Sequence, residues 1–200
     1  MPGSKGYILV EGHGEVKAAH NLVTRLSAEL GLTLPWTTPR RWNNLHRWKA
    51  KSGGVEAGAE FVRSKPDAGA LLILKDEDDG CPKELAPEVA GLLRVLSMPF
   101  PIAYVLLRPE YEVLFLPCLE LMNFPVWDGT SWEERRGIKE WLSGQLPRGR
   151  SYKPTIDQLP MTQKIDFSLL RSADVPCFGT LERSLCFLKE NIESPGKVYP

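Results

Sequence analysis

Residues 70–80 read ALLILKDEDDG, in which five apolar residues lead through Lys75 into four consecutive acidic side chains. A short apolar run followed by a polar turn is typical of a strand buried on both faces, as in a parallel sheet. Acidic residues are poor strand formers, and Asp76 and Asp78 point to the same side if the strand continues. We interpret these acids as ligands of a hard divalent ion such as Mg²⁺. An acidic surface turn closed by Gly80 is the alternative.

Residues 7–15, YILVEGHGE, show the same pattern, with a short β run that ends at Glu11. Apolar positions at helical spacing follow as far as residue 30. The carboxyl ends of parallel strands lie along one edge of an open sheet, where ligands bind, so we expect Glu11 near Asp76 and Asp78. The two glycines allow a tight turn into a helix whose free N–H groups suit a phosphate. The alternative is a plain turn with a solvated glutamate at a helix N-terminus.

Residues 102–107, IAYVLL, form a third apolar run, and RPEYEVLFL follows at residues 108–116. Glu110 and Glu112 are therefore expected at another strand end, where they would complete a second metal position or act as general base. Acids that only open a helix are the alternative, since carboxylates favour helix N-termini.

The alternation of apolar runs and helical patterns predicts an α/β fold, with a mostly parallel sheet flanked by helices. We expect strands at residues 7–10, 32–34, 70–75 and 102–107. Helices are expected at residues 15–30, 56–64, 82–96, 110–122 (broken at Pro117), 132–146 and within 157–188. The predicted organisation is an α/β core over residues 1–122 and a small, mainly helical extension over residues 123–200 that packs on it.

Composition and charge restrict the class of protein. An apolar fraction of 42% suffices for a core, and a formal net charge of zero leaves any polyanion binding to a local patch. The four cysteines form no CxxC pair, which argues against zinc and a disulfide framework and favours a reducing cytosol. No apolar run approaches the roughly 18 residues of a membrane helix, and the first residues lack the apolar core of a signal peptide. We expect a soluble, cytoplasmic protein without membrane contacts.

A basic segment with interleaved tryptophans lies between the first two acidic strand ends. It reads PWTTPRRWNNLHRWKAKSGG at residues 35–54 and contains no acidic residue. Basic groups contact phosphates and aromatic faces stack on unpaired bases, so we predict nucleic-acid contacts. The residues expected to make them are Arg40, Arg41, Trp42, Arg47, Trp48 and Lys49. The alternative is a solvated loop whose tryptophans belong to the core or to a partner interface.

These motifs, in this order, resemble those of the Toprim domain of topoisomerases, primases and OLD-type nucleases. Val10-Glu11-Gly12 and Asp76-Glu77-Asp78 match the Toprim acidic motifs, and both follow hydrophobic strands. The chain is also similar to a short Toprim-like bacterial family, a domain of unknown function often encoded beside an ATPase. Its segments appear as LVEGHGE, LKDEDDGCP, RPEYEVLFL and YKPTIDQLPMTQKIDF, so the resemblance spans nearly the whole chain. That family has an aromatic residue, often Trp, near the position of Leu114.

The resemblance implies a Mg²⁺- or Mn²⁺-dependent nuclease that acts on DNA or RNA, in bacterial anti-phage defence with an AAA- or ABC-type ATPase partner. The alternative is a non-catalytic Toprim-fold subunit that binds metal or nucleotide and regulates such an ATPase. In this chain the implied metal ligands are Glu11, Asp76, Asp78 and Glu110. The implied catalytic residues are Glu11, Glu15, Glu112 and Lys153, the lysine as a cation for the transition-state charge.

Overall fold

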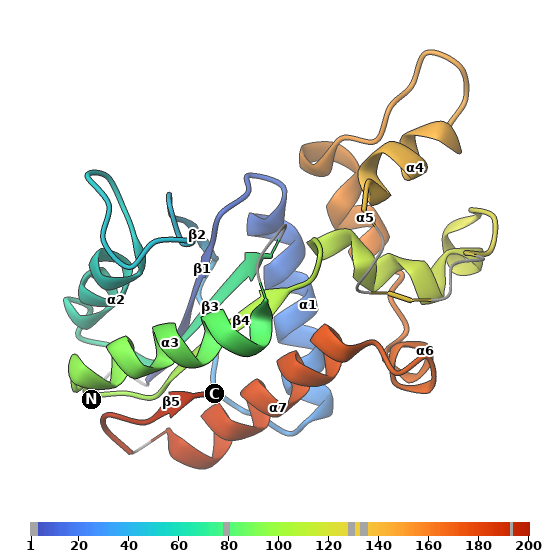
Figure 1. Cartoon of the computed structure of the whole chain (residues 1–200). Coiled ribbons are helices and arrows are strands. Elements are labelled where there is room, and N and C mark those ends of the chain that lie inside the picture. Colours follow the sequence, from blue (N-terminus) through green and yellow to red (C-terminus); the bar gives the residue numbers. More distant parts are fainter. Residues whose placement is uncertain (1–3, 78–80, 128–130, 133–135, 193) are drawn as a thin grey trace.

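The computed structural model describes residues 4–77, 81–127, 131–132, 136–192 and 194–200. Its strands form one sheet in the order β2-β1-β3-β4-β5, and every neighbouring pair is parallel (Figure 1). The strands are β1 (Lys5–Val10), β2 (Arg40–Arg41), β3 (Ala68–Asp76), β4 (Ile102–Leu107) and β5 (Val198–Tyr199). The expected α/β class, with helices flanking a parallel sheet, is confirmed.

The central strand β3 is apolar along its length because both faces of the sheet are covered. Alternate residues of a strand point to opposite faces. Leu72 and Leu74 therefore join the hydrophobic core on one face, which we call core 1, and Leu71 and Ile73 join core 2 on the other. All four side chains are at most 1% exposed. The continuous apolar run reflects this burial on both sides.

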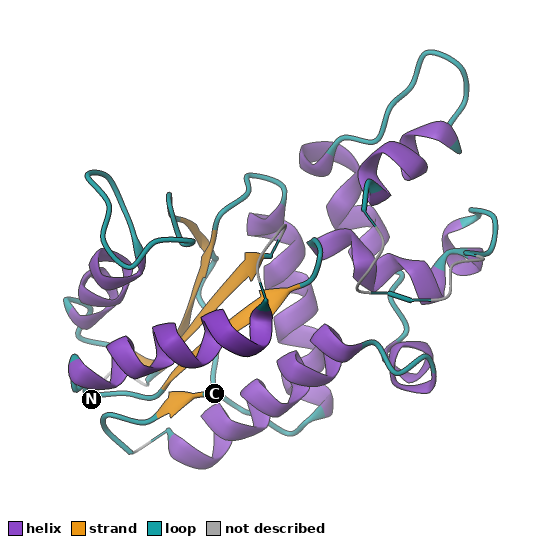
Figure 2. Cartoon of the chain, viewed as in Figure 1, coloured by secondary structure: helices purple, strands orange, loops and turns teal. Residues whose placement is uncertain are grey.

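Each face of the sheet is covered by a pair of helices (Figure 2). Core 1 is closed by α1 (Glu15–Glu29) and α7 (Pro176–Asn191), and core 2 by α2 (Val55–Arg63) and α3 (Pro82–Val95). Both α7 and β5 come from the predicted C-terminal extension, so this part of the chain contributes to the sheet as well as to its helical cover. The division at residue 122 itself stays a prediction.

Short helices continue the chain beyond the carboxyl ends of β3 and β4, where α4 and α5 lie in Figure 1. They are the 3-10 helices η1 (Tyr111–Cys118) and η2 (Glu120–Met122), α4 (Ile138–Gly144), the π-helix η3 (Pro154–Gln158), α5 (Leu159–Thr162) and α6 (Phe167–Ser172). Their buried apolar side chains join core 1. In the described part of the chain, no helix is both long enough and apolar enough to cross a membrane.

The second strand differs from the prediction. It consists of Arg40–Arg41, whereas residues 32–34 form no strand. Leu32 and Leu34 are instead buried in core 1, and the main chain pairs in a strand with β1 only at the two arginines. The apolar residues at 32–34 thus predicted burial correctly, but the strand that they also predicted is absent.

Two predicted helices also differ. Residues 110–122 were expected as an α-helix broken at Pro117, but they form 3-10 helices, and η1 continues through Pro117. Seven of the eight residues of η1 are buried, so packing rather than an amphipathic pattern sets its geometry. Of the helix expected at residues 132–146, the structure has α4, and residues 133–135 lie outside the described part.

Candidate functional site

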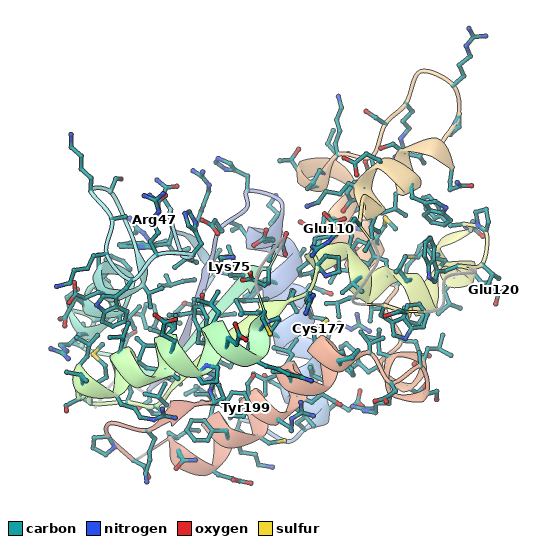
Figure 3. The ribbon with its side chains drawn as sticks, viewed as in Figure 1. Arg47, Lys75, Glu110, Glu120, Cys177 and Tyr199 are labelled. Atoms are coloured by element: carbon teal, nitrogen blue, oxygen red, sulfur yellow. The ribbon has the colours of Figure 1, made fainter. Side chains whose placement is uncertain are left out.

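Three predicted acidic strand ends lie side by side at the carboxyl edge of the sheet. Asp76, the last residue of β3, pairs in register with Leu107, the last residue of β4. Val10, the last residue of β1, pairs with β3 on its other side. The segments that follow these strands therefore start from neighbouring points, and Figure 3 shows Glu110 at this edge.

Lys139 of α4 lies at the centre of the acidic side chains. Its ammonium is 2.9 Å from Glu110 Oε2, 3.4 Å from Glu112 Oε2 and 3.6 Å from Asp76 Oδ2. We call these four residues the acidic centre. Three acids that were predicted to belong to the site are thus brought together, around a lysine that the sequence analysis did not name.

Asp76 and Glu110 each have their second oxygen held by a main-chain donor. The N–H of Tyr111 donates to Asp76 Oδ1 (2.7 Å), and the N–H of Lys139 donates to Glu110 Oε1 (3.3 Å). These contacts hold one oxygen of each carboxylate in place. The remaining oxygen of each group faces the Lys139 ammonium.

Glu112 follows the same arrangement deep in the protein, with its side chain fully buried. Tyr152 Oη (2.8 Å) and Gln158 Nε2 (3.2 Å) both donate to Glu112 Oε1. Glu112 Oε2 has no hydrogen-bond partner among the described residues and lies against Lys139 only as an ion pair. Tyr152 and Gln158 belong to the late segment YKPTIDQ, which the family resemblance had singled out without giving either residue a role.

The electrostatics of the acidic centre follow from its burial. Burial raises the pKa of Glu112 to about 7, although the Lys139 ammonium opposes the shift. Burial, with the charges of Glu15 and Glu112, raises the pKa of Asp76 well above its usual range. Burial alone would lower the pKa of Lys139, but the charges of Glu112, Asp76 and Glu110 together outweigh it and raise that pKa. The centre thus holds more acid than one cation neutralises, which favours a further positive charge.

The EGHGE turn packs tightly between Glu15 and the late segment. Glu15 opens α1 and is 8% exposed; burial raises its pKa. A Cβ atom on Gly12 would lie 2.3 Å from Glu15 Oε1, and one on Gly14 would lie 2.5 Å from Gln158 Oε1 and 2.6 Å from Pro154. Gly14 is therefore needed for close approach to the main chain of Pro154, and it brings the turn against η3, whereas the atoms nearest the Gly12 position belong to the Glu15 side chain.

Glu11 lies on the side of the basic segment. Its carboxylate is 33% exposed and contacts His46 Nδ1 at 3.3 Å, while its carbonyl accepts a hydrogen bond from Arg41 Nε (3.1 Å). The charge of Glu11 contributes to the raised pKa of Glu15, so the two acids influence each other across the turn. Asp78, the other predicted ligand, lies outside the described residues.

The basic segment begins at the same sheet edge, because β2 pairs with the end of β1. Arg40, Arg41, Arg47 and Lys49 are all exposed, and Figure 3 shows Arg47 on the loop that follows β2. Three of these cations have partners: the Arg40 guanidinium covers the ring of Phe61 at 4.4 Å, Lys49 pairs with a glutamate of α2 at 3.3 Å, and Arg41 donates to the Glu11 carbonyl. Arg41 is the exposed arginine that contacts Glu11, and Arg47 is exposed on the loop that follows β2.

The tryptophans of this segment are partly buried. Trp42 Nε1 donates to the carbonyl of Gly54 (2.9 Å), and the Trp42 ring lies 5.2 Å from that of Phe61. Trp48 packs against core 2, and Trp36 packs against core 1. Nucleic-acid contact by Trp42 and Trp48 stays a prediction, but their rings already have partners within the protein.

Lys153 lies apart from the acidic centre. Its main-chain N–H donates to Asp157 Oδ2 (2.8 Å), and its side chain is exposed. The cation that meets the carboxylates is Lys139. No motif in the sequence marks Lys139, which is one basic residue on a seven-residue helix next to Glu140.

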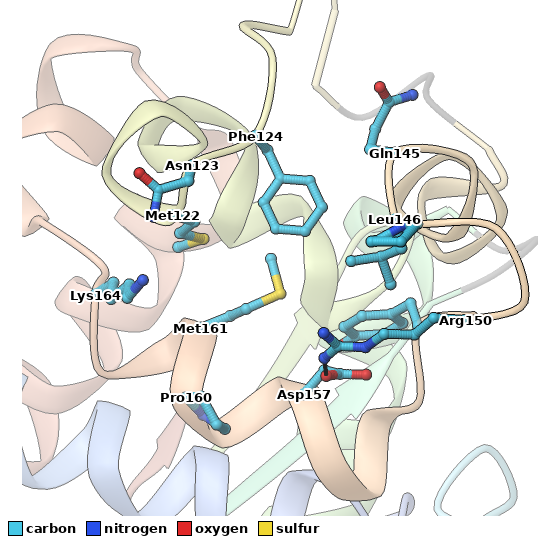
Figure 4. A pocket seen from close by; sticks show the side chains of 12 residues that line it. Met122, Asn123, Phe124, Gln145, Leu146, Arg150, Asp157, Pro160, Met161 and Lys164 are labelled. Atoms are coloured by element: carbon cyan, nitrogen blue, oxygen red, sulfur yellow. Dashed lines mark hydrogen bonds and ion pairs between the residues drawn. The ribbon is translucent and has the colours of Figure 1, made fainter.

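A cavity of about 360 Å³ lies among residues 122–124, 145–152 and 157–164 (Figure 4). Phe124, Leu146 and Met161 form its apolar part, and Arg150 pairs with Asp157 at 2.6 Å on its wall. Tyr152, which holds Glu112 by its hydroxyl, also lines this cavity. The cavity and the acidic centre therefore share one wall.

The donor set of the acidic centre suits a hard cation, because its free ligands are carboxylate oxygens. The buried, unpartnered Glu112 Oε2 adds to this suitability. In the described residues, however, no three His, Cys, Asp or Glu side chains lie close enough together to hold a metal ion. The chemistry fits a divalent metal, whereas the spacing of the carboxylates fits an ammonium group.

Comparison of the chain with protein-family models, with curated proteins and with solved structures found no match, so the inference of function depends on the acidic centre and its surroundings.

Proposed function

We propose that the protein is a Mg²⁺- or Mn²⁺-dependent nuclease that cleaves phosphodiester bonds in DNA or RNA. The observation that supports this most is the convergence of three carboxylate oxygens, from Asp76, Glu110 and Glu112, on one cation position at the carboxyl edge of a parallel sheet. This edge is where open α/β sheets bind ligands. The resemblance of the acidic motifs to the Toprim domain supports the same chemistry.

The roles of the chain's residues follow from their positions. Asp76, Glu110 and Glu112 would hold the metal, which when bound polarises the phosphoryl oxygens and activates water. Glu11 is exposed enough to reach a water molecule and would accept its proton, with His46 in contact to orient the carboxylate. Arg41, at the same edge, would contact the phosphates that flank the scissile bond.

The bacterial ATPase partner and the role in anti-phage defence belong to this proposal on the resemblance alone. The competing function is a non-catalytic Toprim-fold subunit that binds metal or nucleotide and regulates the ATPase. One observation favours it: the Lys139 ammonium already occupies the cation position of the acidic centre.

A cleavage assay distinguishes the two functions. The purified chain is incubated with single-stranded DNA, double-stranded DNA and RNA, in Mg²⁺ or Mn²⁺, with and without the ATPase. We expect metal-dependent cleavage, and Asp76→Asn should lower its rate on the order of a hundredfold or more while the protein stays folded. Equal cleavage by folded Asp76→Asn would contradict the proposal. If the wild type cleaves nothing but changes the ATPase rate, the regulatory function is the correct one.

A further inference from the structure

The free oxygens of the acidic centre are organised before any metal arrives. Asp76 Oδ1, Glu110 Oε1 and Glu112 Oε1 accept hydrogen bonds from the protein at 2.7–3.3 Å. The second oxygen of each group faces Lys139 Nζ at 2.9–3.6 Å. One oxygen of each carboxylate is therefore held by the protein, with two donors at Glu112, and the oxygens that remain share one ammonium.

We propose that the Lys139 ammonium is the resident counter-cation of the acidic centre, and that a divalent metal binds there only by displacing it. This inference rests on the proposed metal-dependent function and concerns how the metal enters. Mg²⁺ holds oxygen ligands at about 2.0–2.1 Å, so the oxygens now spread around Nζ must close in on the ion. Two cations cannot occupy that position together, because their charges repel at short range.

The geometry of Lys139 suits such an exchange. Its side chain is 34% exposed, so the ammonium can move toward solvent on a flexible stem. Its main-chain N–H holds Glu110 Oε1 independently of the side chain, so this carboxylate stays oriented after the ammonium leaves. The oxygens lie at ion-pair distances of 2.9–3.6 Å from Nζ, too widely spaced to enclose a metal as they stand.

If the metal must displace Lys139, removing this lysine should strengthen metal binding. Removing a residue that helps to hold the metal would weaken it. Removing the ammonium leaves partly buried carboxylates uncompensated, and a metal relieves that cost. Isothermal titration with Mn²⁺, after removal of metals by EDTA, should show Lys139→Met binding about tenfold more tightly than wild type, or better. Lys164→Met, a change at an exposed lysine outside the acidic centre, serves as the matched control and should bind like wild type. Equal or weaker binding by Lys139→Met would overturn the proposal.

A second measurement uses the unmodified protein and does not depend on the folding of a variant. Lysine acetylation by a small amine-reactive reagent is followed by peptide mass spectrometry, with and without saturating Mn²⁺. Displacement should raise the acetylation rate of Lys139 several-fold, while Lys164 stays constant as the internal control. An unchanged Lys139 rate in protein that titration shows to be metal-bound rules out displacement.

The two proposals fail in distinguishable ways. If metal binding releases Lys139 but no nucleic acid is cleaved, the nuclease proposal is wrong and the displacement of Lys139 by metal is supported. If cleavage depends on metal but the acetylation rate of Lys139 is unchanged, the nuclease proposal is supported and the displacement of Lys139 is wrong. A wild-type chain and a Lys139→Met chain that both bind no metal contradict both.

Discussion

Glu112 is the most deeply buried acid of the acidic centre. Its side chain is fully buried, yet it is an acid, and the only hydrogen bonds to it from the described residues go to one oxygen. A buried carboxylate is costly unless it is paired or protonated. Tyr152, Gln158 and Lys139 each reduce this cost, which is why substitutions here should change the stability of the protein as well as its chemistry.

The raised pKa of Glu112 predicts how stability depends on pH. Unfolded, this group titrates near its ordinary value of 4.5, and folded it titrates at about 7. Between these values the folded state holds a proton that the unfolded state has lost, so the free energy of unfolding falls as pH rises from about 5 to 7. Asp76 and Glu15, whose pKa values are also raised, act in the same direction.

Glu112→Gln removes this titration and should therefore flatten the dependence of the free energy of unfolding on pH. Urea denaturation in EDTA at pH 5, 6 and 7 measures it, with wild type as the reference. If the free energy of unfolding changes with pH by the same amount in both proteins, Glu112 is already ionised in the folded state throughout this range.

At the scale of elements, the site is made by turns that are packed against segments distant in sequence. The EGHGE turn meets η3 through Gly14, and β2 places the basic segment beside Glu11. The first contact supports the packing around the acidic centre, and the second positions the segment that is predicted to bind nucleic acid. Changes in these contacts should therefore separate fold stability from nucleic-acid binding.

Gly14→Ala tests the contact between the EGHGE turn and η3. The new Cβ would lie 2.6 Å from the main chain of Pro154, which cannot move as a flexible side chain does. We expect destabilisation of about 1–3 kcal/mol in urea unfolding. Gly91→Ala is the control, since a Cβ on this exposed glycine of α3 meets nothing within 4 Å and should stabilise the helix by about 0.5–1 kcal/mol. Loss of stability in both variants, or in neither, contradicts the packing argument.

The double change Arg41→Ala and Arg47→Ala tests the basic segment. Both side chains are exposed, and Arg41 contacts Glu11 at the carboxyl edge of the sheet. Their loss should weaken nucleic-acid binding and lower the slope of log affinity against log salt by about two. Fluorescence anisotropy with an Asp76→Asn background measures binding without cleavage. Arg183→Ala on α7 is the control, and an unchanged slope in the double variant assigns the segment to another partner.

At the scale of the whole molecule, the two predicted parts of the chain depend on each other. α7 lies across β4, and β5 extends the sheet at the same edge. Lys139, Tyr152 and Gln158 also come from the C-terminal part and complete a centre whose acids come from the N-terminal part. Neither the core nor the site is complete without residues 123–200.

A fragment of residues 1–122 should therefore fail to fold on its own. Without α7, core 1 exposes apolar side chains of β4, including Val105 and Leu107, and exposed surface of this kind favours aggregation. Circular dichroism during heating should show no cooperative transition for the fragment, whereas the full chain melts cooperatively. A cooperative melt of the fragment would establish residues 1–122 as an independent domain.

The apolar runs determined the central strands from the sequence alone. The run 102–107 has the bounds of β4, and the run 70–75 lies within β3, because strands buried on both faces need continuous apolar residues. The alternation of these runs with helical patterns was enough for the α/β class. Asp76, Glu110 and Glu112 lie together at one edge, since parallel strands end on the same side, whereas Asp78 lies outside the described residues.

Tertiary structure alone decided the pairing of β2 and the centre of the site. The two arginines of β2 have no apolar pattern of their own, and their strand exists only because β1 offers a free edge. Lys139 has no motif and lies 63 residues from Asp76 along the chain, yet its ammonium meets that carboxylate at 3.6 Å. Local sequence records which face of an element is buried, whereas the meeting of charges from distant segments depends on how those segments pack.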